Sequence, residues 1–479
     1  MLFRNKVSLY YKYAQKGTLK SLWKDILESI SGTDKDFTKE KLSKAILLLS
    51  IPMVLEMVME SVFAVVDIFF VSKLGADAIA TVGITESFIT IIYALGIGLS
   101  TGVSAMVSRR IGEKNKEKAA LSAYQAILSG LAVSLIIAVP GVIFAKDLLL
   151  LMGVSESVAE QMHGYTAVML GGNVTIVLLF IINGVFRSAG NPVLSMWVLW
   201  FANGVNIILD PLLIFGIGPF PELGITGAAV ATTTGRGLAV LLQVYLLIKG
   251  RGSIKFKGIS LKPNITLIKR LLDLSWGSIS QYIVATSSWI ILVRIISIYG
   301  SEVLAGYTIA IRIVIFAILP AFGISNAAST LVGQNLGARL PERAEQSVWV
   351  VGKTNLITMA IIGVILFIFP ITFLSIFTSD PKIIAYGTVA LRIISLGFVS
   401  YGFGMVMVAA LNGAGDTKTP FRINVISFWL FEIPLAWSLA SWGGFHQTGA
   451  YIAIIAAESL MTLFAYMVFK KGKWKLKEV

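Results

Sequence analysis

The sequence predicts an all-α membrane protein, with 12 transmembrane helices in two six-helix bundles related by a pseudo-two-fold axis along the membrane normal. Three observations predict it. Apolar residues make up 56% of the 479-residue chain and charged residues only 14%, whereas soluble domains carry about 25% charged residues. Apolar runs long enough to cross a bilayer recur along the whole chain, and the second half of the chain repeats the first.

Twelve segments are apolar over the roughly 20 residues that a helix needs to cross a membrane. The long basic stretch 249–273 divides them into two sets of six, so we expect an N-terminal lobe at 45–248, a linker at 249–273, a C-terminal lobe at 274–469 and a tail at 470–479. The predicted spans are 45–72, 79–108, 119–145, 159–186, 192–215, 225–248, 274–298, 303–332, 345–374, 383–411, 420–442 and 449–469.

Lys and Arg are unevenly distributed between the two sides of these spans. If the N-terminus is inside, 32 of the 40 Lys and Arg fall in inner loops and tails, and only Lys73, Lys146 and Lys382 fall in outer loops. Because such residues concentrate in cytoplasmic loops, we expect both termini on the cytoplasmic side of an inner or plasma membrane. The net charge of +14 therefore reports topology, and no nucleic-acid partner is expected.

Residues 1–44 hold ten Lys or Arg and lack the apolar core of a cleavable signal. Within them, 19–30 places six apolar residues on one helical face, a pattern typical of an amphipathic helix lying on the membrane surface. A loose basic tail is the alternative, because the pattern covers only about three turns.

Residue types that support metal, redox or nucleotide chemistry are scarce. The chain has no Cys and two His, His163 and His446, which excludes thiol chemistry, Cys-ligated zinc and iron–sulfur clusters. It also lacks the GxxxxGK(S/T) phosphate-binding motif, so ATP is not expected to drive it directly. We expect no cofactor and no enzyme activity.

An internal repeat runs through the chain at one constant shift, which carries position 98 onto position 323. GLSTGVSAMVSRRIGEKNKEKA (98–119) aligns without gaps on GISNAASTLVGQNLGARLPERA (323–344), with seven of 22 positions identical, and SAGN (188–191) falls on GAGD (413–416). Each half has an even number of spans, so both enter the membrane in the same direction. Two such facing bundles are typical of transporters that work by alternating access.

Several motifs resemble those of one known family, the multidrug and toxic compound extrusion (MATE) transporters, over residues 45 to 470. They are SIPMVLEMVMESVFAVVDIFFVSKLG, GVSAMVSRRIGEKN, FRSAGNP, NIILDPLLIFG, LGITGAAVAT and LNGAGDTKTP. The larger superfamily also contains lipid-linked oligosaccharide flippases of similar architecture, which are the alternative. GAGDTKTP and LDPLLIFG look more like the drug-export branch.

Acidic residues inside the spans are the candidate functional residues, since a charge at the bilayer centre costs about 2.5–3.5 kcal/mol. Helical spacing puts three acids of the first span on one face, and two asparagines and an aspartate of the fifth span on another. These residues are Glu56, Glu60, Asp67, Asn203, Asn206 and Asp210.

Asp67 and Asp210 lie at the same predicted depth, about 8 Å below the outer ends of their spans. Two close carboxylates cannot both ionise cheaply at low dielectric, so the pair is expected to take up a proton or a small cation. Tyr165 starts at a comparable level and Thr232 about one turn deeper. Asn and Thr oxygens would complete a Na⁺ shell or hydrogen-bond a protonated acid. If Na⁺ is the coupling ion, the predicted ligands are Asp67, Asp210 and Asn206.

The resemblance implies the same site. One MATE branch binds H⁺ or Na⁺ in the N-terminal bundle through an Asp of the first span and an Asn-x-x-x-Asp of the fifth, which Asp67, Asn206 and Asp210 match. Tyr165 and Thr232 are looser transfers, and so is Asn183. Another branch uses acids in the seventh and tenth spans, where this chain offers Gln281 and Arg392 but no acid.

Other polar residues in the spans have competing interpretations. Glu56, Glu60, Asn203 and Gln281 are expected to line a substrate cavity, although the two glutamates could instead pair with neighbouring residues. Asp210 precedes Pro211, and such a pair can merely cap or kink a helix.

Charges elsewhere in the spans are expected to pair with one another. Arg236 is expected to pair with Glu86 or Glu60. In the C-terminal lobe, four charges at equal depth predict one buried network, which either holds the bundle together or contacts an anionic substrate. They are Arg312, Arg392, Glu432 and Glu458.

Together these observations predict a monomeric antiporter that exports amphipathic organic compounds by alternating access, driven by H⁺ or Na⁺. Its expected partners are a small amphipathic organic substrate and membrane lipids. The alternative is the flippase of the same superfamily, whose cavity should be lined by cations that hold a pyrophosphate.

Overall fold

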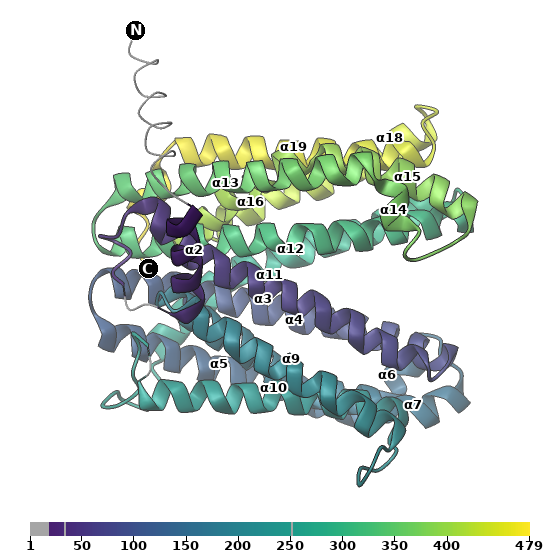
Figure 1. Cartoon of the computed structure of the whole chain (residues 1–479), viewed down its shortest axis with the longest axis horizontal. Helices are drawn as coiled ribbons and strands as arrows, with labels where there is room; N and C mark the ends of the chain where they lie inside the picture. The colour runs from purple at the N-terminus through teal and green to yellow at the C-terminus, as the bar shows by residue number, and fades with distance from the viewer. Residues whose placement is uncertain (1–18, 33–34, 251) are drawn as a thin grey trace.

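The computed structural model describes residues 19–32, 35–250 and 252–479, and every regular element in these ranges is a helix (Figure 1). The first half contains α2 (Leu19–Ser31), α3 (Leu42–Ser72), α4 (Ala76–Gly112), α5 (Lys116–Ile143), α6 (Ala145–Leu151), α7 (Glu156–Gly171), α8 (Asn173–Ser188), α9 (Pro192–Phe215) and α10 (Gly224–Lys249). The second half contains α11 (Ile265–Ser297), α12 (Ser301–Gly337), α13 (Pro341–Ile368), α14 (Pro370–Leu374), α15 (Pro381–Leu396), α16 (Phe398–Gly413), α17 (Lys418–Asn424), the π-helix η1 (Val425–Glu432), α18 (Ile433–Ser441), α19 (Gln447–Lys470) and the 3₁₀-helix η2 (Lys473–Leu476).

The described helices are long and apolar enough to cross a membrane ten times, or eleven times if α15 and α16, which meet at 51°, form one span. The predicted first span is the 31-residue helix α3, which packs against two of these spans, α9 and α12. The predicted fold class is confirmed, and 12 spans are consistent with this count once α3 is included.

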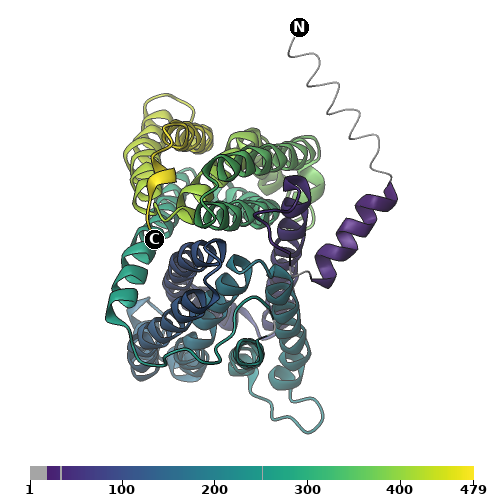
Figure 2. The same ribbon diagram turned by 90° about the vertical axis from the view of Figure 1, so that its left-hand side faces the viewer.

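Two groups of helices lie side by side when the molecule is viewed along the helices (Figure 2). We call α3–α10 the N-lobe and α11–α19 the C-lobe. Each lobe has its own hydrophobic core, but the first helix of each lobe is shared. Leu49 and Met53 of α3 are buried with residues of α12 and α13, while Leu271 and Leu274 of α11 are buried in the N-lobe core.

The repeat in the sequence is also a repeat in the structure. Gly172 separates α7 from α8 in the fourth span, and Gly397, its equivalent in the repeat, separates α15 from α16 in the tenth. A Cβ at Gly172 would lie 2.5 Å from Cγ2 of Thr233. Glycine is therefore required at this break because the neighbouring helix leaves no room for a side chain.

The lobes meet at the end where α2 lies, here called the closed end, and diverge toward the end that carries α6 and α14 (Figure 1). At the closed end α4 crosses α12 at two glycines that are equivalent in the repeat. A Cβ at Gly112 would lie 2.0 Å from the backbone oxygen of Gln334, and one at Gly337 would lie 2.1 Å from that of Arg109. Small residues of this kind allow helices to approach closely in a membrane.

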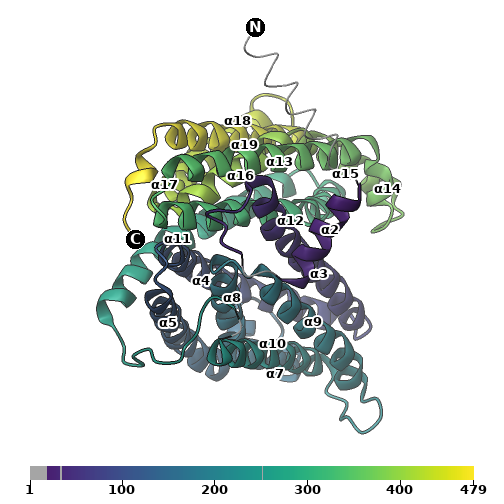
Figure 3. The same ribbon diagram turned by 60° about the vertical axis from the view of Figure 1, so that its left-hand side comes forward.

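Helix α2 lies beside the lobes near the closed end, outside both of them (Figures 2 and 3). Lys44 of α3 forms ion pairs with Asp25 at 3.3 Å and Glu28 at 2.7 Å. Trp23 and Leu27 are 62% and 53% exposed, so α2 keeps an apolar face free. Residues 19–31 are thus helical as expected, and the location of this helix on the membrane surface stays a prediction.

Candidate functional site

Helix α3 carries its three acids toward α8, α9 and α10. The helix is continuous over Leu42–Ser72 although Pro52 lies inside it, where the missing N–H removes one backbone hydrogen bond. Glu56, Glu60 and Asp67 share one face; Glu56 bonds to residues of α8, Glu60 to α9, and Asp67 lies within electrostatic range of α10.

Glu56 forms a buried ion pair with the N-lobe residue Arg187. Nη1 of Arg187 donates to Oε1 of Glu56 at 2.8 Å, and Nδ2 of Asn183 donates to the same oxygen at 3.2 Å. Gln243 of α10 in turn donates to Oδ1 of Asn183 at 2.6 Å. Asn183, predicted for the coupling site, therefore has its side chain engaged with Glu56 and Gln243 rather than with Asp210.

One turn further along α3, Glu60 is half-buried and faces α9. Nδ2 of Asn203 donates to Oε2 of Glu60 at 3.4 Å and to the backbone oxygen of Met59 at 3.5 Å. The structure thus brings together two of the residues predicted for the substrate cavity, inside the N-lobe.

Asp210 lies in the N-lobe interior and is fully buried, with 0% exposure. Nδ2 of Asn206, one turn earlier on α9, donates to Oδ1 of Asp210 at 3.3 Å and to Oγ1 of Thr232 at 3.0 Å. Oδ2 of Asp210 and Oδ1 of Asn206 are buried without a hydrogen-bond partner. The i, i+4 spacing on α9 and the approach of α10 therefore assemble three predicted residues around one buried carboxylate.

Asp67 lies close enough to Asp210 for the two carboxylates to interact electrostatically. Tyr165 of α7 is buried and also lies within electrostatic range of Asp67. The structure thus brings Asp67, Asp210, Asn206, Thr232 and Tyr165 into one region of the N-lobe.

Arg236 of α10 adds a positive charge to this region. It is buried, and its Nη2 donates to the hydroxyl of Tyr93 at 3.2 Å. Asp67 and Glu60 both lie within electrostatic range of its guanidinium. Glu60 is one of the two partners expected for Arg236, whereas the proximity of Asp67 was not predicted. The sequence could have indicated this proximity, because Arg236 follows Thr232 by one turn of α10 and so shares its face.

Gln281 lies apart from the N-lobe acids. Its Nε2 donates to Oδ1 of Asn412 at 3.1 Å and to the backbone oxygen of Thr417 at 2.9 Å, and Asn412 donates back to its Oε1 at 3.2 Å. The nitrogen and the oxygen of the Gln281 side-chain amide thus both form hydrogen bonds within the C-lobe, next to the GAGD turn. This bonding pattern is that of a brace between α11 and α16.

The expected single network of four C-lobe charges does not form. Arg312 and Arg392 are exposed. Arg312 lies within electrostatic range of Glu86 on α4 of the other lobe, and Nε of Arg392 donates to the backbone oxygen of Phe367 at 3.3 Å. The prediction from equal depth was wrong because depth along a helix leaves the direction of the side chain open.

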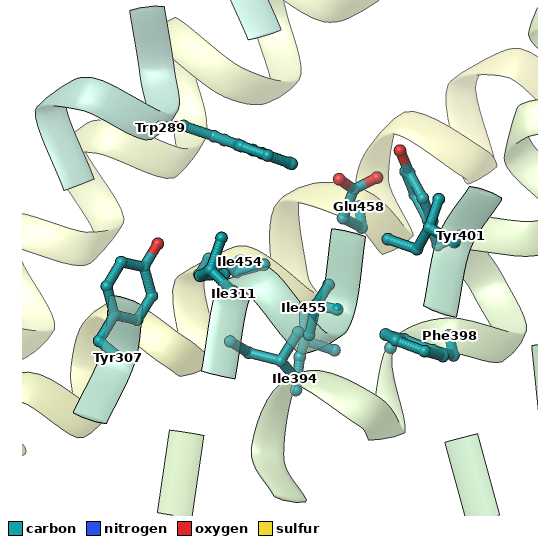
Figure 4. A pocket seen from close by; sticks show the side chains of 12 residues that line it. Trp289, Tyr307, Ile311, Ile394, Phe398, Tyr401, Ile454, Ile455 and Glu458 are labelled. Atoms are coloured by element: carbon teal, nitrogen blue, oxygen red, sulfur yellow. The ribbon is translucent and has the colours of Figure 1, made fainter. Parts of the chain in front are cut away.

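Only the two acids of that set lie close together. Glu432 is buried and accepts a hydrogen bond from Ser288, and Glu458 lies within electrostatic range of it. Glu458 lines a cavity of about 30 Å³ walled by aliphatic and aromatic side chains. Figure 4 shows Glu458 beside Tyr401, with Trp289 and Tyr307 across the cavity. Oε2 of Glu458 has no hydrogen-bond partner.

The oxygen atoms around Asp210 fit a proton or a hard cation. Two carboxylates, one amide oxygen and two hydroxyls lie in the region, and oxygen donors suit hard cations. Among the described residues, no three His, Cys, Asp or Glu side chains lie close enough to hold a metal ion. A Na⁺ ion would therefore use Asn206 and Thr232 oxygens in addition to the carboxylates of Asp67 and Asp210.

The chain matches the MatE family over two segments, residues 52–212 and 278–438, one in each lobe. It is 28% identical over 447 residues to the probable multidrug resistance protein NorM of Thermotoga maritima, covering 92% of this chain and 94% of that protein. It is 26% identical over 395 residues to the FAD transporter of Shewanella oneidensis, covering 82% and 87%.

Among solved structures, the chain superposes with a TM-score of 0.85 on one described as the outward-facing conformation of a multidrug resistance MATE family transporter. That protein is 25% identical, and the alignment covers 91% of this chain and 98% of that one. Proteins of this kind are transporters, which confirms the expectation that the chain is not an enzyme. The two matched segments together cover more than half of the chain, and on this ground the protein belongs to the MatE family of membrane transporters.

Proposed function

We propose that the protein is an antiporter of the cell membrane that exports small amphipathic organic compounds and is driven by H⁺ or Na⁺. Both termini, and with them the closed end, would face the cytoplasm. The multidrug resistance protein and the FAD transporter among its relatives support an organic substrate. The distribution of Lys and Arg supports the orientation.

One observation carries the coupling assignment. Oδ2 of Asp210 and Oδ1 of Asn206 are buried acceptors without a donor, beside a second carboxylate, that of Asp67. A buried carboxylate without a compensating charge is costly. Uptake of a proton or a small cation by Asp210 would remove this cost, and the carboxylate of Asp67 would favour that uptake.

Arg236 would interact differently with the cation-free and the cation-bound site. Its guanidinium lies near Asp67 and Glu60, so it compensates part of their charge when the site has released its cation. When Asp210 and Asp67 take up a cation, the positive charge of Arg236 is repelled from Asp67 toward Glu60 and Tyr93. The two arrangements would differ in how α3 contacts α10, which links cation uptake to the position of α3.

Helix α3 is suited to pass this change to the rest of the molecule. Its outer half carries Asp67 in the N-lobe, while its inner half, with Leu49 and Met53, is buried against the C-lobe. Pro52 lies within this inner half, next to Met53, and weakens the helix there. A change at Asp67 would thus bend or shift α3 relative to the C-lobe, and this movement would release the substrate.

The flippase alternative gains no support from the relatives described above. A flippase cavity needs cations that converge on a pyrophosphate, whereas Arg392 is engaged with the backbone of Phe367 and Arg312 lies near Glu86.

Transport by the purified protein in proteoliposomes tests the proposal. An imposed H⁺ or Na⁺ gradient should drive movement of a fluorescent organic cation, and Asp67→Asn and Asp210→Asn should each remove most of this gradient-driven transport. Asp147→Asn is the matched control, because Asp147 is an exposed N-lobe acid of α6. Transport that survives both substitutions at Asp67 and Asp210 would refute the coupling assignment.

A further inference from the structure

Two equivalent glycine turns at the closed end are each covered by a residue from a distant part of the chain. Gly190 lies between α8 and α9, Gly415 lies between α16 and α17, and the two occupy the same position in the repeat. Both have a φ of +87°, which glycine adopts without strain. Because glycine has no side chain, another residue packs directly on each turn: Phe37 on Gly190 and Val479 on Gly415.

Phe37 contacts both lobes. It is 2% exposed, and a Cβ at Gly190 would lie 2.8 Å from its Cε2, so it lies directly on the N-lobe turn. Arg343 of α13 in the C-lobe donates to the backbone oxygen of Phe37 at 3.1 Å and to that of Glu40. Asp36 fixes this turn, because its Oδ1 accepts from the backbone N–H of Thr38 at 3.0 Å.

Residues 472–479 also connect the two lobes, but this segment is anchored in the C-lobe and bonded by the N-lobe. Trp474 is buried and stacks on Phe469 of α19 at 4.8 Å, which anchors the segment to the C-lobe. Two arginines of the N-lobe helix α4 then hold its end. Nη2 of Arg109 donates to the backbone oxygen of Lys477 at 2.7 Å, and Nη2 of Arg110 donates to that of Val479 at 2.9 Å.

Both links span the interface that has to separate if the closed end opens. We propose that residues 35–41 and 472–479 are two latches that hold the lobes together at the closed end, and that each must release its contacts with one lobe before that end can open. This inference rests on the alternating access of the proposed function. It adds a role for two segments outside the membrane spans that neither the coupling site nor the substrate cavity uses.

The latches would set the balance between the two access states. Each contains hydrogen bonds from an arginine to backbone oxygens, and loss of one such charge-assisted bond changes an equilibrium by about tenfold or more. Weakening either latch should therefore make the closed end open more often, without any change at Asp67 or Asp210.

The absence of cysteine from the chain makes this opening measurable. Thr330 of α12 is 4% exposed and its hydroxyl faces the backbone oxygen of Arg187 across the lobe interface at 3.5 Å. A Thr330→Cys variant should react with a membrane-impermeant maleimide, added on the closed-end side of oriented vesicles, only when that end opens. Ser195→Cys reports on the N-lobe interior, since Ser195 is buried and bonds to Asn183 within that lobe.

In the Thr330→Cys background, Phe37→Ala, Arg343→Gln and Arg110→Gln should each raise the labelling rate about tenfold, and Phe37→Leu should raise it less. Leu476→Ala is the control within the second latch, because Leu476 is 84% exposed, and it should leave the rate unchanged. Ser195→Cys should stay unlabelled in all these variants.

Unchanged labelling of Thr330→Cys in the three latch variants would overturn the proposal. Labelling of Ser195→Cys together with Thr330→Cys would also overturn it, because that result means loosening of the whole lobe rather than opening of one end. The assay uses neither substrate nor an ion gradient. Its outcome is therefore separate from that of the Asp67→Asn and Asp210→Asn transport test, and either proposal can fail alone.

Discussion

At the scale of residues, the N-lobe acids differ in how their charge is compensated. Glu56 has a full partner in Arg187, whereas Asp210 faces only an amide among its hydrogen-bond partners. Helical spacing predicted which acids share a face. It could not predict that Asn183 would turn to Glu56, because that choice depends on Gln243 and Arg187 from other parts of the lobe.

The ion pair of Glu56 and Arg187 should stabilise the fold rather than drive transport. Removing one partner of a buried pair leaves an uncompensated charge and costs about 3–5 kcal/mol. We expect Arg187→Ala to lower the free energy of unfolding in detergent by about this amount, and Glu56→Gln combined with Arg187→Gln to restore most of it. A double variant no more stable than Arg187→Ala would contradict the assignment.

Arg236 should oppose cation uptake at the neighbouring carboxylates. Without its charge, the cation concentration that gives half-maximal transport should fall about tenfold, equivalent to ~1.4 kcal/mol. The measurement is transport by Arg236→Gln at graded H⁺ or Na⁺ concentrations. Arg294→Gln is the control, because Arg294 lies in the C-lobe helix α11 and is exposed. A half-maximal concentration that stays constant or rises would speak against the proposed competition.

At the scale of elements, the hydropathy pattern predicted the spans, including α9 with its acid. The breaks at Gly172 and Gly397 were not predicted, because a single glycine inside an apolar run does not by itself end a helix. The crossing of α4 and α12 at Gly112 and Gly337 was also outside the reach of sequence, since it is a contact between distant segments.

That crossing should be sensitive to a single methyl group. Gly112→Ala places a Cβ 2.0 Å from the backbone oxygen of Gln334, so α4 and α12 have to separate and the closed end should open more often. Gly83→Ala in the same helix meets nothing within 4 Å and should have no such effect. Labelling of Thr330→Cys compares the two, and equal rates would show that close approach at Gly112 is not needed for closure.

The docking of α2 should depend on pH. Hydrogen bonds from Lys35 and Lys44 lower the pKa of Glu28 below its usual value of 4.5. A lowered pKa means that the ionised carboxylate stabilises the docked state, fully above pH 4.5 and progressively less as the pH falls through the pKa of the docked state. A spin label at Trp23→Cys should thus gain mobility only below pH 4.5.

Glu28→Gln is the control for this transition. It removes the titrating group, so the label should be more mobile at every pH and show no step. The same step in Glu28→Gln would mean that another group controls the docking of α2.

At the scale of the whole molecule, the internal repeat predicted two facing bundles, and the two matched segments of the MatE family agree with it. Sequence alone did not show that each lobe buries the inner half of its first helix in the other lobe, because Leu49 and Leu271 look like ordinary core residues. Through this exchange α3 connects the proposed cation site of the N-lobe to the core of the C-lobe.

The central claim is that Asp67 and Asp210 release their cation when substrate binds. Proton release on addition of substrate to the purified protein, with and without Na⁺, tests it most directly. We predict either a release of protons or, if Na⁺ is coupled, substrate binding that Na⁺ weakens, and in both cases the effect should vanish in Asp210→Asn and persist in Asp147→Asn. A response of wild-type size in the Asp67→Asn, Asp210→Asn double variant would contradict the account.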